Sequence, residues 1–281
     1  MIIWLASYPK SGNTLLRSIL GTYFFSSDGV FDFQYTYKIG QFPVLEQFQK
    51  TGIDISNDEE IFKNYIKVQN SLNIENKSIK FFKTHSAYFD RKTDKVKFSN
   101  LENTLGVIYV IRDPRNIVSS WAHHYQLSMN EATDQICDKD LFSKRTEAHP
   151  QIFMSSWKLN YLSWQGLGKK VLLIKYEDLI GEKKKKTLIK VFDFFKLLGM
   201  NQKSFNISKL NKVIKSTEFS KMKELEKKQG FREAPIDEKT GKRITFFNKG
   251  PKNKWKEVLD EKNQKKIEET FKQEMTDLEY L

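Results

Sequence analysis

Residues 2–25 read IIWLASYPKSGNTLLRSILGTYFF and contain the pattern that decides the fold. Ile2–Ala6 is a short apolar run of the kind that forms a buried β-strand. Ser7–Asn13 supplies proline and glycine, which are typical of a turn, and Thr14–Phe25 has the apolar spacing of an amphipathic helix. The stretch therefore predicts a strand, a turn and a helix, in that order.

Three later apolar runs predict further strands, at Ile79–Thr84, Val107–Ile111 and Val171–Ile174. They are apolar on both faces, which is typical of parallel strands covered by helices, and Asn116–Leu127 has helical spacing after the second of them. The sequence shows no internal repeat and no linker. We therefore expect one α/β domain over residues 1–281, with a central parallel β-sheet flanked by helices and ligands at the carboxyl ends of the strands.

The composition is that of a globular protein with a strong excess of positive charge. Hydrophobic residues make up 39% of the chain, which includes 22 phenylalanines, so a substantial core can form. The formal net charge is +13. This charge favours a polyanionic partner, whether nucleic acid, an acidic membrane surface or a phosphorylated small molecule, although scattered surface lysines account for much of it.

Cys137 is the single cysteine, which excludes an intrachain disulfide and a cysteine-based metal site. The four histidines and the scattered carboxylates show no spacing that indicates a metal site of another kind. The first residues lack the pattern of a secretion signal, and no apolar run approaches the length of a membrane span. We expect a cytoplasmic protein without a metal.

The predicted turn after the first strand has the chemistry of an anion site. Backbone N–H groups at a helix start point outward without a partner, and the helix dipole adds positive potential there. Gly12 lets the main chain approach a phosphate closely, while Lys10 adds a charge and Thr14 a hydroxyl. The turn therefore favours phosphate binding over an ordinary Pro-Lys-Ser-Gly turn. The GxxxxGK[ST] pattern of nucleoside-triphosphate sites is absent.

Two other strand ends carry polar residues suited to a site. Arg112 ends the third strand and Ser120 follows two helical turns later; an arginine fork matches phosphate oxygens, but Asp113-Pro114 also makes an ordinary helix start. Lys83-Thr84-His85 ends the second strand. The adjacent cation and burial favour a neutral imidazole, so His85 is a candidate general base, although a lone histidine is more often structural.

Four segments outside the strand ends have less specific sequences. Thr217–Met222 favours helix packing, and the basic segment Asn248–Lys256 is either a phosphate wrap or a charged turn. The four lysines 183–186 favour a solvated helix end over a nucleic-acid patch, and residues 223–242 predict a surface loop. The remaining histidines, His123, His124 and His149, have no comparable context.

Taken together and in order, these segments resemble the family of sulfotransferases that use 3′-phosphoadenosine 5′-phosphosulfate (PAPS). The resemblance covers residues 3–256. Within it, the stretch SGNTLLR is similar to the bacterial members of the family. The segments that carry it are YPKSGNT at 8–14, KTH at 83–85, IRDPRNIVSS at 111–120, YEDL at 176–179, STEFSKM at 216–222 and NKGPKNKWK at 248–256.

The resemblance implies a P-loop-like nucleotide-binding fold, PAPS as co-substrate with adenosine 3′,5′-bisphosphate (PAP) as product, and no metal. It also implies a catalytic role for His85 as base, with Lys83 on the transferring group and Lys10 on the leaving oxygen, by in-line displacement at sulfur. The residues that it implies for the 5′-phosphosulfate are Lys10, Ser11, Gly12, Asn13, Thr14 and Leu15. For the 3′-phosphate it implies Arg112, Ser120, Lys249 and Gly250. For the adenine it implies Tyr176, Thr217 and Phe219.

The chain departs from the family pattern at three positions. Leu15 replaces a tryptophan that stacks on adenine in cytosolic members, Asn248 replaces an arginine, and Asn253 replaces the second glycine of the last segment. These departures predict that the segment closes differently. The 3′-phosphate would then be held more weakly, or by Lys252 or Arg243.

The acceptor cannot be read from the sequence, and we expect a hydroxyl or amine on a small molecule, a carbohydrate or a lipid. Residues 26–78 and 128–168 lie between the nucleotide segments and are the expected lining. The aromatic residues of these segments include Phe31, Phe33, Tyr35, Tyr37, Trp157 and Trp164. They either stack on the acceptor or fill the core, and we favour the core. A homodimer is possible. The alternative functions are a P-loop-type kinase and a nucleic-acid-binding protein, for which no recognition motif is present.

Overall fold

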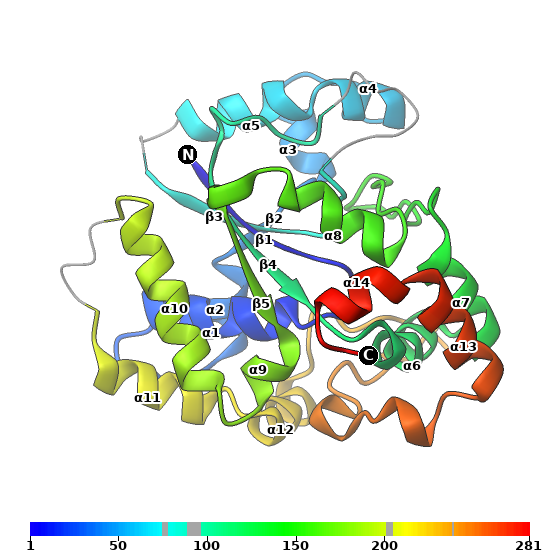
Figure 1. Cartoon of the computed structure of the whole chain (residues 1–281). Coiled ribbons are helices and arrows are strands. Elements are labelled where there is room, and N and C mark those ends of the chain that lie inside the picture. The colour runs from blue at the N-terminus through cyan, green and yellow to red at the C-terminus, as the bar shows by residue number, and fades with distance from the viewer. Residues whose placement is uncertain (75–77, 89–96, 201–204, 238) are drawn as a thin grey trace.

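Five parallel strands form the central sheet of the computed structural model, in the spatial order β2-β3-β1-β4-β5 (Figure 1). The structure describes residues 1–74, 78–88, 97–200, 205–237 and 239–281. The strands are β1 (Ile2–Ser7), β2 (Gly40–Gln41), β3 (Lys80–Thr84), β4 (Thr104–Ile111) and β5 (Val171–Lys175). The strand order reverses at β1, which lies between β3 and β4, and such a switch point opens a crevice at the carboxyl ends of the strands.

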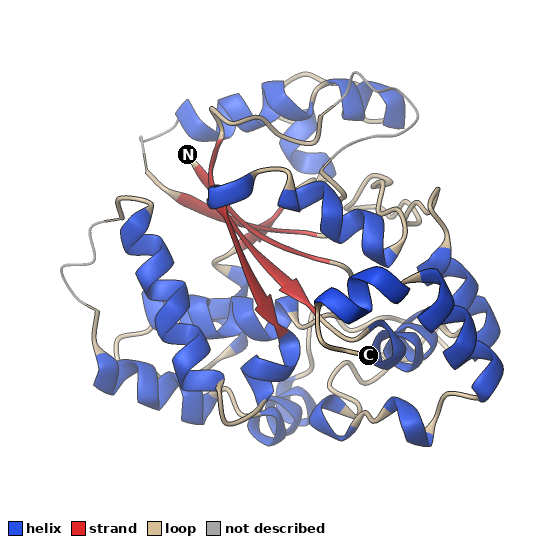
Figure 2. Ribbon diagram, in the orientation of Figure 1, coloured by secondary structure: helices blue, strands red, loops and turns tan. Residues whose placement is uncertain are grey.

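Helices cover both faces of this sheet (Figure 2). The α-helices are α1 (Asn13–Phe25), α2 (Phe33–Tyr37), α3 (Leu45–Gln49), α4 (Asp58–Lys63), α5 (Tyr65–Ile74), α6 (Pro114–Tyr125), α7 (Met129–Cys137), α8 (Trp157–Gln165), α9 (Tyr176–Ile180), α10 (Lys184–Leu197), α11 (Ile207–Ser216), α12 (Phe219–Gln229), α13 (Glu261–Thr270) and α14 (Lys272–Asp277). Short 3₁₀ turns are η1 (Gly168–Lys170), η2 (Gly250–Lys252) and η3 (Trp255–Glu257).

Alternate side chains of the strands enter two separate hydrophobic cores. Trp4 of β1 packs in the core formed with α5, α6, α8 and α13, whereas its neighbour Leu5 packs in the core formed with α1, α9, α10 and α11. Both side chains are fully buried. Since successive strand residues point to opposite faces, an apolar run such as β1 is stable only where helices cover both sides.

A third apolar cluster joins segments that are far apart in the chain. Phe31 and Phe33 near α2 pack with Met222 of α12 and with Phe231 and Phe247 of the segment that follows it. The rings of Phe33 and Phe231 are 4.7 Å apart between centroids. This cluster holds Phe231 and Phe247 beside the start of α1, because Leu15 also packs against it.

The structure confirms the predicted strand–turn–helix and the three later strands, with small changes at their ends. One local prediction was wrong in part, because residues 223–229 form the end of α12 rather than a loop. The sequence analysis also missed β2, since two residues show no periodicity. Because α12 buries only Met222 along its length, its charged surface gives little apolar signal.

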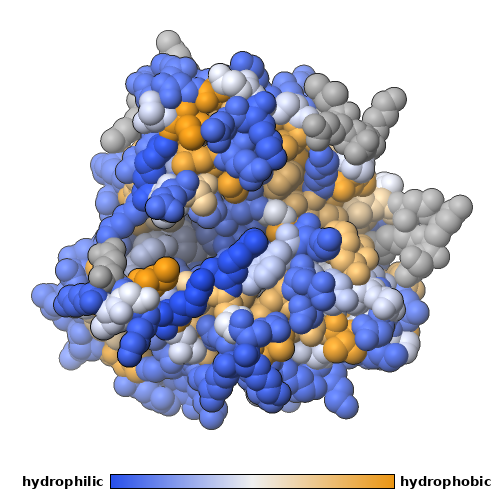
Figure 3. Space-filling model, turned by 180° about the vertical axis from the view of Figure 1, so that it is seen from behind, coloured by the Kyte–Doolittle hydropathy of each residue, from blue (hydrophilic) through white to orange (hydrophobic). Residues whose placement is uncertain are grey.

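The molecular surface is mostly hydrophilic on the face seen from behind, and this face is hollowed (Figure 3). None of the helices in the described residues is long and apolar enough to cross a membrane.

Candidate functional site

A cavity of about 1310 Å³ lies at the carboxyl ends of the strands. Its walls come from the turn after β1, the ends of β3, β4 and β5, the helix α6, and three later segments, 217–222, 232–236 and 246–253. Every site residue predicted from the sequence lines this cavity except Ser11, which is fully buried behind it. The sheet therefore brings together segments that the sequence places up to 240 residues apart.

The turn after β1 has a constrained backbone. Lys10 has φ 65°, which is unusual for a residue with a side chain, and Gly12 has φ 102°. A Cβ atom on Gly12 would lie 2.4 Å from Cδ2 of Tyr176, so only glycine fits. The Asn13 side chain donates to the Leu5 carbonyl oxygen at 2.7 Å and to Ser7 Oγ at 3.2 Å, which ties the turn back to β1.

The start of α1 provides the groups of an anion site. The Leu16 N–H already bonds to the Gly12 carbonyl oxygen at 3.1 Å, and the Ser11 N–H bonds to the Tyr8 carbonyl oxygen at 3.3 Å. The N–H groups of residues 12–15 are those that a helix start leaves unpaired. Thr14 lines the cavity beside them. Ser11 Oγ is buried and has no hydrogen-bond partner among the described residues.

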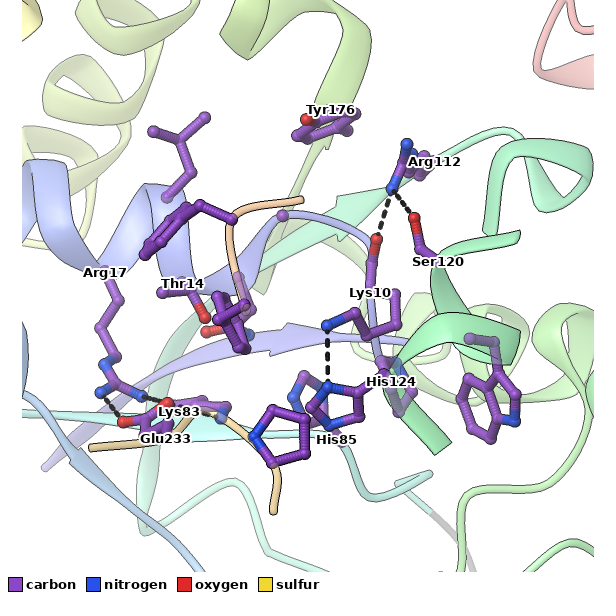
Figure 4. A pocket seen from close by; sticks show the side chains of 18 of the residues that line it. Lys10, Thr14, Arg17, Lys83, His85, Arg112, Ser120, His124, Tyr176 and Glu233 are labelled. Carbon is purple, nitrogen blue, oxygen red and sulfur yellow. Dashed lines mark hydrogen bonds and ion pairs between the residues drawn. The ribbon is translucent and has the colours of Figure 1, made fainter. Parts of the chain in front are cut away.

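Arg112 joins the turn to β4 and α6 (Figure 4). Its Nη1 donates to the Lys10 carbonyl oxygen at 2.8 Å and to Ser120 Oγ at 3.3 Å. Its guanidinium lies over the ring of Tyr176, with 4.5 Å between Cζ and the ring centroid. The Nε atom is buried and has no partner within the described part of the chain, so a donor remains for a ligand.

Lys10 Nζ lies 3.2 Å from Nδ1 of His124 and 4.3 Å from the centroid of the Phe246 ring. Burial, together with Lys83 and Arg112, lowers the pKa of Lys10 to about 7. Burial and Lys10 lower the pKa of His124 to about 2, so its imidazole is neutral and accepts a hydrogen bond from the lysine.

The sequence analysis gave His124 no place in a site, and this was wrong, because His124 contacts Lys10 in the cavity. His123 and His149 line the cavity as well. The signal that could have identified His124 is its spacing. It follows Ser120 by four residues and so lies on the same face of α6.

His85 follows β3 and lies against the end of β1. Its Nδ1 is 2.8 Å from the Ser7 carbonyl oxygen, which can only accept, so Nδ1 carries the proton and Nε2 holds the lone pair. Burial and then Lys83 lower the pKa of His85 to about 3. The neutral imidazole agrees with the expectation from its sequence neighbours.

A carboxylate that the sequence analysis missed lies beside Lys83. Glu233 forms ion pairs with Lys83, at 3.5 Å, and with Arg17 of α1 (Figure 4). Burial opposes ionisation of Glu233, but Lys83 and Arg17 outweigh it and lower its pKa to about 2. No local motif surrounds this glutamate, since its partners precede it by 150 and 216 residues.

The remaining predicted nucleotide residues are held by packing. Thr217 Oγ1 bonds to the Val213 carbonyl oxygen at 2.8 Å, and a Cβ atom on Gly250 would lie 2.2 Å from the Phe219 ring. Lys249 lines the same wall of the cavity. The alternative phosphate ligands Lys252 and Arg243 do not line it, and Arg243 instead bonds to backbone carbonyl groups of residues 231–234.

Both segments expected to contact an acceptor contribute to the cavity wall. Of the six aromatic residues named from the sequence, Tyr37 lines the cavity. Trp157 and Trp164 are fully buried in the core. The other lining residues from these segments include Gln41, Pro43, Phe142, Ile152 and Met154. In the part of the chain that the structure describes, no three His, Cys, Asp or Glu side chains are grouped so that they could hold a metal ion.

Comparison with known protein families shows which family this chain belongs to. A model of the sulfotransferase domain matches residues 2–279. The chain belongs to the sulfotransferase family. The luciferin sulfotransferase of Photinus pyralis is 28% identical over 228 residues, an alignment that covers 79% of this chain and 56% of the Photinus protein. The chain thus spans little more than half the length of that relative.

Solved structures share the fold of this sulfotransferase. Mouse sulfotransferase SULT7A1, crystallised with PAP, aligns with a TM-score of 0.60 and 22% identity over 97% of this chain and 83% of the mouse chain. Retinol dehydratase, crystallised with retinol and PAP, aligns with a TM-score of 0.61 and 17% identity over 98% of this chain and 81% of the other. These matches confirm the expected P-loop-like α/β fold.

Proposed function

We propose that this sulfotransferase moves a sulfuryl group from PAPS to a hydroxyl or amine acceptor by in-line displacement, with His85 as the general base. The observation that carries the proposal is the set of side chains and backbone groups that line one cavity. It holds the start of α1 with Lys10, the Arg112–Ser120 pair, and an imidazole whose Nε2 lone pair is free. Family membership and the PAP bound to two structural neighbours support the choice of nucleotide.

The cavity offers two anion pockets suited to the two phosphorylated ends of PAPS. The backbone N–H groups of residues 12–15, with Lys10 and Thr14, would bind the 5′-phosphosulfate, while the Ser11 N–H closes the turn onto Tyr8. Arg112 and Ser120, with Lys249 and Gly250, would bind the 3′-phosphate. The unpartnered donor at Arg112 Nε fits this arrangement.

Between the two pockets, aromatic and threonine side chains suit an adenine. Tyr176, Thr217 and Phe219 line this part of the cavity. Leu15, which stands where cytosolic members have tryptophan, also lines it. Leucine offers an apolar contact in place of ring stacking, so we propose that Tyr176 and Phe219 provide the aromatic surface for the base.

His85 is arranged to take a proton at Nε2. The hydrogen bond from its Nδ1 to Ser7 fixes both the tautomer and the direction of the ring. Its pKa of about 3 reflects burial and surrounding cations. A bound polyanion offsets those cations and raises the pKa, so the imidazole becomes a stronger base when the co-substrate is present. His85 would then accept the acceptor proton as the new oxygen–sulfur or nitrogen–sulfur bond forms.

Lys10 would stabilise the oxygen that leaves with the nucleotide. Negative charge develops there as the sulfur–oxygen bond breaks, and a fixed cation in a dry site lowers the energy of that state. Lys83 lies on the acceptor side, next to His85 along β3, where it would contact the transferring group. A sulfuryl group carries less charge than a phosphoryl group, so we expect the reaction to need no metal. A cytoplasmic location and a homodimer remain predictions.

The test is sulfation of a mixed acceptor panel with labelled PAPS, followed by mass spectrometry of the products. We expect a labelled sulfate ester or sulfamate, no loss of turnover with EDTA, and a loss of about 100- to 10,000-fold in His85→Ala. Wild-type turnover in His85→Ala would remove the base assignment. ATP consumption that EDTA abolishes, without binding of PAP, would favour the kinase alternative instead.

A further inference from the structure

Asn253 follows η2 and is the residue at which this chain departs from the glycine of the family pattern. Its side chain is buried, with 7% of the residue exposed. Its Oδ1 accepts from Ser119 Oγ at 2.8 Å, and its Nδ2 donates to the Asn116 carbonyl oxygen at 2.7 Å and to Ser120 Oγ at 3.2 Å. A glycine could make none of these three contacts.

The partners of Asn253 fix the orientation of its amide. The Asn116 carbonyl oxygen can only accept, so the NH₂ group must face it. The second hydrogen of the same group then points to Ser120, and Oδ1 is left for the Ser119 hydroxyl. All hydrogen bonds of this side chain therefore go to α6, the helix that carries Ser120.

Ser120 receives two N–H donors at its Oγ. Arg112 Nη1 donates at 3.3 Å and Asn253 Nδ2 at 3.2 Å. A hydroxyl has two acceptor lone pairs and one proton. With both lone pairs engaged, the proton is left to be donated, and Ser120 lines the cavity. The hydroxyl is thus oriented as a donor toward an anion before the anion arrives.

Asn253 also anchors the other half of this pocket. Its N–H bonds to the Gly250 carbonyl oxygen at 3.1 Å, which closes η2, and Gly250 packs against Phe219. One residue therefore fixes both the Ser120 hydroxyl and the backbone next to Lys249. The two groups come from segments more than 100 residues apart.

We propose that Asn253 is a positioning residue for the 3′-phosphate of the nucleotide and so sets the preference for a nucleotide that carries this phosphate. The inference rests on the proposed function. It assigns Asn253 no contact with the ligand. The residue acts through Ser120 and through the Lys249–Gly250 backbone.

The experiment measures the affinity of PAP and of adenosine 5′-monophosphate, which lacks the 3′-phosphate, by calorimetry in Asn253→Ala. Loss of an orienting hydrogen bond weakens PAP binding by about three- to tenfold, while the monophosphate affinity stays the same. In a Ser120→Ala background the Asn253→Ala effect on PAP should shrink. Asn211→Ala on the exposed surface of α11 removes a matched amide and should change neither affinity.

A second variant keeps the test valid if Asn253→Ala unfolds. Asn253→Leu has a similar size but cannot donate to Ser120, and it adds no charge beside the phosphate, so the same selective loss of PAP affinity is expected. Equal weakening of both nucleotides, or no change in either, would overturn the role of Asn253. Failure of the wild-type protein to bind PAP at all would instead overturn the proposed function.

Discussion

The two sides of the cavity are built in different ways. On the nucleotide side, the Lys10–Asn13 turn and Arg112 directly follow strands, and hydrogen bonds from the Asn13 and Arg112 side chains to backbone carbonyl oxygens hold the turn in place. On the acceptor side, Lys83 and His85 also follow a strand, but the charge balance of Lys83 depends on Glu233, which is distant in sequence. Hydrogen bonds to the backbone therefore hold the turn, whereas a long-range ion pair balances the charge on the acceptor side.

This difference predicts whether a substitution should change binding and turnover or should change stability. Changes on the nucleotide side should alter binding and turnover while leaving the fold intact, because the strands and α1 are stabilised by their own cores. Changes in the Arg17–Glu233–Lys83 network should alter stability first, because each of these charges compensates another in a partly dry environment.

The largest effect on the nucleotide side is expected for Lys10→Ala. Removal of the cation at the leaving oxygen should lower turnover with PAPS by about 100- to 1000-fold. Thermal unfolding should change little. The exposed Lys169→Ala removes the same charge far from the cavity and should leave turnover unchanged. Equal turnover in Lys10→Ala and Lys169→Ala would contradict the role of Lys10.

Glu233→Ala should show the contrast from the acceptor side. It leaves Arg17 and Lys83 without their carboxylate, and removing one partner of such a buried network costs about 3 kcal/mol of unfolding free energy. Urea denaturation measures this loss. Glu224→Ala, which breaks the exposed pair with Lys228, should leave the denaturation midpoint nearly unchanged. A Glu233→Ala protein as stable as the wild type would break the comparison.

Gly12→Ala tests whether the turn depends on local geometry alone. The new methyl group would meet the Tyr176 ring in a left-handed backbone conformation, at a cost of about 2 kcal/mol. We expect PAP affinity to fall more than tenfold, which calorimetry can measure. Gly52→Ala has a similar positive φ with no neighbouring atom within 4 Å, so it should share the backbone strain without affecting PAP binding. A similar loss of PAP affinity in both variants would exclude the steric explanation.

A smaller effect is expected from pH. The pKa of Lys10 is about 7 in the free protein, and a bound anion raises it. PAP affinity should therefore be greatest below pH 7 and fall above it, by at most tenfold per pH unit. Titrations from pH 6 to pH 9 measure this slope, and Lys10→Met should reduce it. An unchanged slope in Lys10→Met would assign the pH dependence to another group.

The sequence predicted the parts of the molecule whose causes are local. The strand–turn–helix at the N-terminus follows from apolar spacing interrupted by Pro9 and Gly12, and the structure confirms it. The predicted polar residues after β3, β4 and β5 reach the same cavity because parallel strands bring their carboxyl ends to one edge.

The features that were missed depend on tertiary contacts. Glu233 lies in a charged stretch that resembles any solvated loop, and its role depends on the aromatic cluster that holds Phe231 and Ala234 beside α1. β2 exists only because it pairs with β3. His124 acquires its partner Lys10 only when α6 packs beside the turn. No pattern within these segments encodes such neighbours.

The position of β1 in the middle of the sheet also constrains how the protein forms. β1 is the first strand of the chain, yet it pairs only with β3 and β4, which begin at Lys80 and Thr104. Pairing over such separations slows folding, since a long loop must close before any contact forms. During synthesis, residues 2–7 therefore have no partner strand until the ribosome has released β3, and both neighbours of β1 are in place only after β4 has followed.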